Sequence, residues 1–112
     1  GLDDLKEDYG YKASKGQASD SIPDIGLALV ERKVDVLMLE EGKGLPGTFD
    51  NTTGTVTFDG SKDPVDPEKL DPASPDIAGA FAEAAILQDA KVVVLAADMM
   101  PTASGIAATF RF

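Results

Sequence analysis

The chain has 112 residues and a formal net charge of −10, so it has the size of one domain, residues 1–112, and its charge disfavours direct binding to nucleic acid. Cysteine and histidine are absent, which excludes disulfides, thiolate metal sites and Ser-His or Cys-His catalysis within the chain. No apolar run approaches the roughly 20 residues of a membrane span and no signal peptide is visible, so a cytoplasmic location is expected.

The first predicted element is a helix at the start of the chain. Apolar side chains recur at helical spacing from Leu2 to Tyr9, and Gly10 predicts the end of this helix. The polar segment that follows, residues 11–20, has the composition of a loop.

A second helix and a strand follow the polar segment. Ser21 has the spacing of a helix cap, and Pro23 falls in the first turn, where its missing N–H costs nothing. These residues predict a helix over about 22–33. The β-branched and leucine-rich run at 34–39 predicts a strand that is covered on both faces.

A long acidic segment rich in glycine and proline extends from about residue 40 to residue 74. Only residues 55–58 alternate well enough to form a strand, at an edge. Such a long excursion in a small domain is usually a functional or mobile loop, and here it is where a basic partner would be bound. The acidic candidate interaction positions in it are Glu40, Glu41, Asp63 and Asp66.

The last third predicts one helix and two strands. Ser74 as cap and Pro75 at the first helical position begin the helix. An unbroken apolar run predicts a central strand at 91–97, and residues 105–112 predict a last one. The apolar face of the helix is expected to contain Ile77, Phe81, Ala84, Ala85 and Leu87. The order of elements indicates an α/β domain with helices packed on a mixed sheet.

Several segments could suggest chemistry, but each has a simpler interpretation. The acids at 58–71 lack the spacing of a calcium loop, and residues 42–47 lack the phosphate-binding glycine pattern and predict a turn. Thr102 and Ser104 would need a neighbouring base to act as nucleophiles, so turn or cap hydroxyls are favoured. No catalytic residue, metal or cofactor is expected.

The closing stretch, residues 99–112, reads MMPTASGIAATFRF. Pro101 and Gly105 predict a turn, and the apolar run after it predicts a strand on which the last two phenylalanines share a face. Arg111 then falls on the opposite side, which predicts a residue that faces solvent or pairs with an acid.

This stretch resembles the C-terminal signature of bacterial proteins related to the archaeal and eukaryotic class I peptide-chain release factors. Their last domain closes on Met-Pro-Thr, a glycine, a hydrophobic residue, Ala-Ala and an arginine followed by an aromatic residue. Pro101, Thr102, Gly105 and Arg111 occupy these signature positions. The predicted helix and strand at 20–40 are similar to those of the same domain in the release factors and in the ribosome-rescue protein Pelota.

The resemblance implies a three-layer α-β-α fold with a mixed sheet, like the kink-turn-binding ribosomal proteins and the third domain of class I release factors. It also implies a domain that contacts a translational GTPase and does no hydrolysis. In the family, peptide release belongs to another domain with a Gly-Gly-Gln loop, and this sequence contains no Gly-Gly-Gln.

Three functions remain open at this point. The leading hypothesis is a non-catalytic C-terminal interaction domain of a release-factor-like protein, with a protein partner such as a translational GTPase or the ribosome. The second is a small-molecule binding or hydrolase domain, which predicts a pocket at the C-terminal ends of the strands. The third is a structural or dimerisation domain, which predicts an exposed apolar edge along residues 106–112. The sequence leaves the oligomeric state open.

Overall fold

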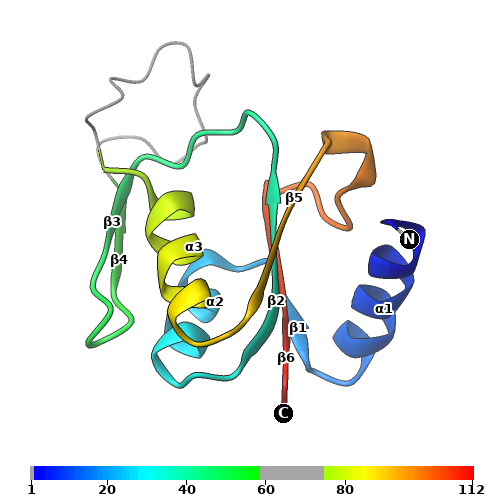
Figure 1. The fold of residues 1–112 in the computed structure, drawn as a ribbon, viewed down its shortest axis with the longest axis horizontal. Coiled ribbons are helices and arrows are strands. Elements are labelled where there is room, and N and C mark those ends of the chain that lie inside the picture. Colours follow the sequence, from blue (N-terminus) through cyan, green and yellow to red (C-terminus); the bar gives the residue numbers. More distant parts are fainter. Residues whose placement is uncertain (1, 59–74) are drawn as a thin grey trace.

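The computed structural model describes residues 2–58 and 75–112. Two sheets are formed in this part of the chain (Figure 1). The elements are α1 (Leu2–Ser14), β1 (Ala18–Ser19), α2 (Ile22–Val30), β2 (Val34–Glu40), β3 (Gly47–Phe49), β4 (Val56–Phe58), α3 (Ile77–Leu87), β5 (Lys91–Leu95), the short 3-10 helix η2 (Ala97–Met99) and β6 (Ile106–Phe110). The main sheet has the strand order β1-β6-β2-β5, and β3 and β4 form a separate hairpin. The main sheet is mixed, because β2 runs parallel to β5 and antiparallel to β6.

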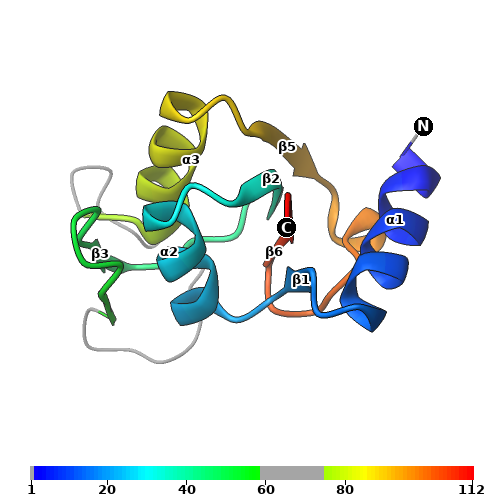
Figure 2. The same cartoon turned by 90° about the horizontal axis from the view of Figure 1, so that it is seen from below.

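Helices cover both faces of the main sheet. Helices α2 and α3 lie on one face and α1 lies on the other (Figure 2). The larger core, between the sheet and α2 and α3, includes Leu37 of β2, and the smaller core, under α1, includes Met38. Strand β2 is thus covered on both faces, as its sequence predicts. The three-layer α-β-α fold expected from the resemblance is confirmed.

The order of strands differs from one prediction. Strand β5 was expected to be central, but it lies at the edge of the main sheet, and the side chain of Val94 is 61% exposed. The two interior strands are β2 and β6; β6 lies between β1 and β2 and is buried at every residue from Ile106 to Phe110. An apolar run alone therefore does not place a strand: the neighbours of β5 in the sheet, and the side chains that cover its faces, come from residues distant in the sequence.

The first two helices end at residues other than those predicted. Helix α1 continues through Gly10, because one glycine in a helix costs only about 1 kcal/mol. It ends before Gly16, whose φ of 73° allows the N–H of Gln17 to donate to the carbonyl of Lys12. Helix α2 has the predicted Ser21 cap but stops at Val30 rather than near residue 33, because residue 32 adopts a positive φ of 58°.

The cap of α3 also differs from the prediction. Asp76 is the cap, and its carboxylate accepts a hydrogen bond from the N–H of Ala78, so Pro75 precedes the helix instead of occupying its first position. Ser74 lies outside the described residues. The expected apolar face is correct at Ile77, Phe81 and Ala85, which are buried, but Leu87 is 74% exposed because the helical turn carries it away from the face that these residues share.

Within the described part of the long acidic segment, β3 and β4 form a hairpin. The strand predicted at 55–58 is present as β4, but it pairs with β3 instead of the main sheet. Strand β3 and the two-residue strand β1 were not predicted, since two or three residues carry too little pattern. Asp63, Asp66 and most of the segment 58–71 considered for calcium lie outside the described residues.

Candidate functional site

The residues of the signature form the turn before β6. The Thr102 hydroxyl donates to the carbonyl of Ile106 at 3.0 Å, and the Ser104 hydroxyl lies 3.0 Å from the same oxygen and 3.2 Å from the carbonyl of Asp20. Both hydroxyls are therefore engaged with backbone carbonyls, as expected for turn hydroxyls. The turn starts at Pro101, where the predicted loop begins.

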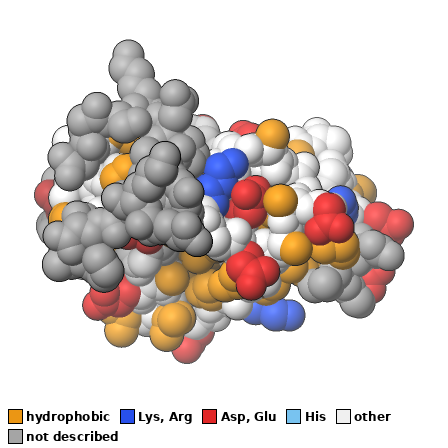
Figure 3. Space-filling model, turned by 90° about the horizontal axis from the view of Figure 1, so that it is seen from above, with side chains coloured by type: hydrophobic (Ala, Val, Ile, Leu, Met, Phe, Trp, Pro, Cys, Tyr) orange, Lys and Arg blue, Asp and Glu red, His pale blue; other side chains and the backbone are white. Residues whose placement is uncertain are grey.

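At this turn the backbones of Glu40 and Gly105 are joined by a hydrogen bond, and the side chain of Lys43 packs beside both residues. The N–H of Glu40 donates to the carbonyl of Gly105 at 3.0 Å. Lys43 lies across Gly105, with its Nζ 3.3 Å from the carbonyl of Ala103 and 3.8 Å from Oε2 of Glu40. A Cβ at Gly105 would lie 2.6 Å from Cδ of Lys43, so the lysine stem uses the space that glycine leaves. Glu41 is exposed beside this group. Figure 3 looks onto this end of the molecule, where basic and acidic side chains lie side by side.

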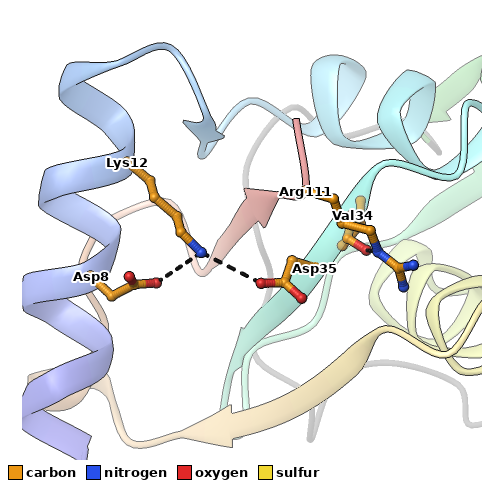
Figure 4. A network of polar contacts seen from close by, with 5 residues as sticks. All are labelled: Asp8, Lys12, Val34, Asp35 and Arg111. Atoms are coloured by element: carbon orange, nitrogen blue, oxygen red, sulfur yellow. Dashed lines mark hydrogen bonds and ion pairs between the residues drawn. The ribbon is translucent and has the colours of Figure 1, made fainter.

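Arg111 binds backbone carbonyls. Its Nε donates to the carbonyl of Val34 at 3.0 Å (Figure 4). Nη2 donates to the carbonyl of Gln88 at 2.9 Å. The residue is exposed, as expected, but its partners are not carboxylates. The guanidinium thus connects the end of β6 to the start of β2 and the end of α3. The expected face shared by the last two phenylalanines does not form, because the strand ends at Phe110 and Phe112 is 70% exposed.

The turn at residues 42–47 has no phosphate-binding geometry and instead joins α3. Oδ1 of Asp76 accepts from the N–H of Leu45 at 3.0 Å as well as from the N–H of Ala78 at 3.3 Å. The N–H of Ile77 donates back to the carbonyl of Leu45 at 2.8 Å. One carboxylate therefore caps α3 and fixes the chain that leads into the hairpin.

A shallow groove runs along the side of α3 that faces the hairpin. It consists of neighbouring hollows of about 180, 160 and 400 Å³, and it is called the α3 groove below. Its wall residues are Phe49, Asn51, Ala80, Glu83, Ala84 and Leu87. These hollows lie away from the C-terminal ends of β2 and β5, where the hydrolase hypothesis predicted a pocket.

Two further features bear on possible functions. In the part of the chain that the structure describes, no group of three or more acidic side chains is placed to hold a metal ion. Among the helices of residues 2–58 and 75–112, none has both the length and the apolar character needed to cross a membrane.

The comparisons with known proteins support the fold. No family model and no curated protein matches the chain. Among solved structures, the C-terminal domain of a peptide chain release factor from Methanosarcina mazei matches with a TM-score of 0.67 and 21% sequence identity. The match covers 100% of this chain and 82% of that chain.

The chain has the fold of this release-factor domain. The resemblance inferred from the sequence is confirmed at the level of the fold. In this release-factor fold, the signature segment supplies the closing turn and the interior strand β6.

Arg111 is expected to contribute to the stability of the domain through its carbonyl contacts. Replacing Arg111 by alanine removes charge-assisted hydrogen bonds to two carbonyls, so we expect the free energy of unfolding to fall by about 2 kcal/mol. Arg111→Lys should recover less than half, because a single ammonium does not reproduce the planar fork of donors. Urea denaturation followed by circular dichroism measures both, with the exposed Lys91→Ala as control.

A result in which Arg111→Ala and Lys91→Ala unfold at the same urea concentration would show that the carbonyl contacts of Arg111 contribute nothing to stability. The two replacements remove the same charge, so the comparison isolates the hydrogen bonds from the change in net charge.

Lys12 connects α1 to the main sheet. Its Nζ lies 3.3 Å from Oδ2 of Asp8 on the same helix and 3.4 Å from Oδ2 of Asp35 on β2 (Figure 4). Burial opposes the charge of Lys12, but the hydrogen bonds and charges of Asp8 and then Asp35 outweigh it and raise the pKa above its ordinary value of 10.5. Sequence patterns missed this contact, because Asp35 lies in a strand far from the helix.

The raised pKa predicts a pH-dependent contribution. The folded chain holds this proton more tightly than the unfolded chain, so the stabilisation is present below pH 10.5 and is lost as the pH rises through the raised pKa. We expect Lys12→Met to lower stability by less than about 1 kcal/mol at neutral pH, because the pair is partly exposed. Urea denaturation of both proteins should show this difference vanish at strongly alkaline pH. A difference that persists there would reflect packing of the lysine stem instead of its charge.

Proposed function

We propose that this chain is a non-catalytic interaction domain of a release-factor-like protein that works at or near the ribosome in the cytoplasm. One observation carries the proposal: the whole chain takes the fold of a release factor's C-terminal domain, and the segment that resembles the release-factor signature forms its closing turn and interior strand. The partner is a protein, and a translational GTPase or a ribosomal protein is the class that the resemblance implies.

The charges and edges of the domain favour a protein partner over nucleic acid. Ten more acids than basic residues oppose the approach of a phosphate backbone. The candidate surfaces for such contacts are the acidic segment from Glu40 onward and an exposed sheet edge, and edge strand β5, with the exposed side chain of Val94, offers such an edge.

The two alternative functions have less support. The hydrolase hypothesis would use the hydroxyls of Thr102 and Ser104 as nucleophiles. Both hydroxyls donate hydrogen bonds to the backbone carbonyl of Ile106, which is what hydroxyls that stabilise a turn do. For the dimerisation hypothesis, residues 106–110 form strand β6, which lies between β1 and β2 and is buried at every residue, so the exposed apolar edge that this hypothesis expects is not found among them.

The test uses the full-length release-factor-like protein of which this chain is proposed to be a domain; it is called the parent protein below. The tagged protein and a variant that lacks residues 1–112 of this chain are purified from cells after mild cross-linking, and co-purifying proteins are identified by mass spectrometry. We expect ribosomal proteins or a translational GTPase with the full-length protein and their loss with the deletion variant. Recovery of neither class with the full-length protein would contradict the proposal.

A further inference from the structure

Strand β5 forms an outer edge of the main sheet and has unpaired backbone groups. Its strand partner among the described residues is β2 alone. The N–H of Glu41 donates to the carbonyl of Leu95, so the backbone groups of Leu95 point toward β2. Because backbone groups alternate between the two edges of a strand, those of Val93 also face β2. The N–H and C=O of Val92 and Val94 face outward and have no strand partner in residues 2–58 and 75–112.

The outer side of β5 is exposed. The side chain of Val94 is 61% exposed to solvent. The described residues that flank segment 59–74 lie at the hairpin, since Phe58 ends β4 and the carbonyl of Pro75 accepts a hydrogen bond from Gly47. The hairpin and β5 lie on opposite sides of α3 (Figure 2). An edge with exposed N–H and C=O groups is a place where a further strand can add to a sheet.

The side of α3 that is turned toward β5 is apolar. Ala82 and Ile86 are four residues apart, so they lie on one side of the helix, and Ile86 is 63% exposed. Leu87 and the charged residue of α3, Glu83, line the α3 groove beside the hairpin. The charge of α3 therefore lies away from the β5 edge, and an exposed apolar side chain lies toward it.

The side chains of β5 extend this apolar surface. Val92 packs against the larger core, on the face of the sheet that α2 and α3 cover, and Val94 points to the same face because it is two residues later. Val93 points to the opposite face and packs against the smaller core. Together with Ala82 and Ile86, these valines give the edge an apolar flank, and such exposed surfaces mark protein contacts.

The two ends of β5 differ in charge. Lys91 begins the strand, and Arg111 binds the carbonyl of Gln88 just before it, while Asp89 offsets part of this positive charge. The acids at the other end outnumber the lysines there: Glu40, Glu41 and Asp98 against Lys6 and Lys43. A strand with the same order of charges is therefore attracted when it runs antiparallel to β5 and repelled when it runs parallel.

A second copy of β5 fits this edge when it runs antiparallel about a two-fold axis at Val93. Val92 of each copy then lies opposite Val94 of the other. Both residues point their backbone groups outward, so the two strands exchange N–H···O=C hydrogen bonds. Pairs of β-branched side chains across strands are favourable. Lys91 of each copy lies opposite Leu95 of the other, at its acidic end, whereas a parallel copy would place the two lysines side by side.

The same two-fold axis places both α3 helices on one face of the joined sheet. The sides of the helices that carry Ala82 and Ile86 then face each other across the axis. Small alanine side chains allow the helices to approach, and the contact removes Ile86 from water. The edge and its flank are thus complementary to themselves in hydrogen bonding, in apolar surface and in charge.

We propose that a second copy of this chain binds along β5, antiparallel about a two-fold axis at Val93, and forms a symmetric dimer whose main sheet continues from one copy into the other. The inference goes beyond the proposed function, because it concerns contact between two copies and leaves the acidic segment from Glu40 onward to a different protein partner. It places the dimer contact at β5, whereas the dimerisation hypothesis from the sequence expected it at residues 106–112.

The association of the chain with itself tests the inference directly. A five-residue edge buries less area than a standard stable interface, so we expect a dissociation constant on the order of 50 µM by sedimentation equilibrium. Amide hydrogen exchange followed by NMR locates the contact. The N–H groups of Val92 and Val94 should become protected as the protein concentration rises, whereas that of Val93, which faces β2, should be protected throughout.

Two variants address the hydrogen bonds and the charges separately. Val94→Pro removes an N–H that points away from β2, which an edge strand tolerates, and should weaken the dimer at least about tenfold. Val94→Thr keeps the N–H and the β-branched shape and should dimerise. Lys91→Glu places an acid at the acidic end of the other copy and should weaken the dimer about tenfold. Lys15→Glu makes the same charge change next to β1, at the opposite edge of the sheet, and should leave it unchanged. Thermal unfolding by circular dichroism verifies that each variant is folded.

The outcomes distinguish a second copy from another occupant. A chain that stays monomeric up to about 500 µM, tenfold above the expected constant, overturns the inference, and so does a dimer that survives both Val94→Pro and Lys91→Glu. If the chain is monomeric but the parent protein with Val94→Pro loses its ribosomal or GTPase partner, β5 binds that partner instead, and the proposed function stands without the dimer. If the dimer forms as expected but the unaltered parent recovers no such partner, the proposed function fails and the inference stands.

Discussion

Replacing Phe81 by alanine is expected to lower the free energy of unfolding by about 3–5 kcal/mol. The side chain is fully buried between the main sheet and the hairpin, and its ring packs edge-on against Phe49 with the centroids 4.9 Å apart. Small domains have a total stability of about 5–15 kcal/mol, so this variant should lose a large share of the stability of the domain. Urea denaturation followed by circular dichroism gives the value.

The matched control lies six residues later on the same helix. Leu87 is 74% exposed, so Leu87→Ala should change stability by no more than about 0.5 kcal/mol. Similar losses in the two variants would mean that α3 does not pack through its Phe81 face, and the arrangement of α3 between sheet and hairpin would then be wrong.

Gly47→Ala is expected to cost about 3 kcal/mol, from backbone strain and from crowding together. Gly47 has a φ of 150°, which L side chains rarely adopt. A Cβ there would collide with the backbone oxygen of Thr57 and lie 2.8 Å from Cδ1 of Ile77. The added methyl would therefore force apart the hairpin and the first turn of α3, and denaturation in urea measures the loss.

Gly42→Ala provides the control for backbone conformation. Gly42 has a φ of 73°, but a Cβ at that position meets nothing within 4 Å. Only the conformational cost applies, so we expect a loss of about 1 kcal/mol. Equal losses at the two glycines would show that the hairpin yields to a methyl group at Gly47 without cost.

Local sequence patterns predicted the elements whose determinants lie within a few residues of one another. The Ser21 cap, the proline at position 23 and the apolar run at 34–39 correctly placed α2 and β2. They failed where the outcome depended on distant partners: β5 and β6 have similar apolar runs, and only the pairing of β6 with both β1 and β2 makes it the interior strand.

The candidate site was predictable only in part. The turn from Pro101 to Gly105 follows from its own residues, and it is present. The carbonyl partners of Arg111 belong to residues 34 and 88, and backbone carbonyls leave no trace in a sequence pattern. The α3 groove requires residues 47–51 and 80–88 to come together, so no single stretch of the chain could indicate it.

The interior place of β6 constrains when this domain can fold during its synthesis. Strands β1 and β2 are joined in the sheet only through β6, which lies between them and pairs with both, and β6 follows every other described element in chain order. A nascent chain that has emerged only as far as β5 can form the β2–β5 pair, but the N–H and C=O groups at the other edge of β2 have no strand partner until β6 emerges. The sheet is therefore completed after residue 110 has left the ribosome, and assembly of the domain follows its translation.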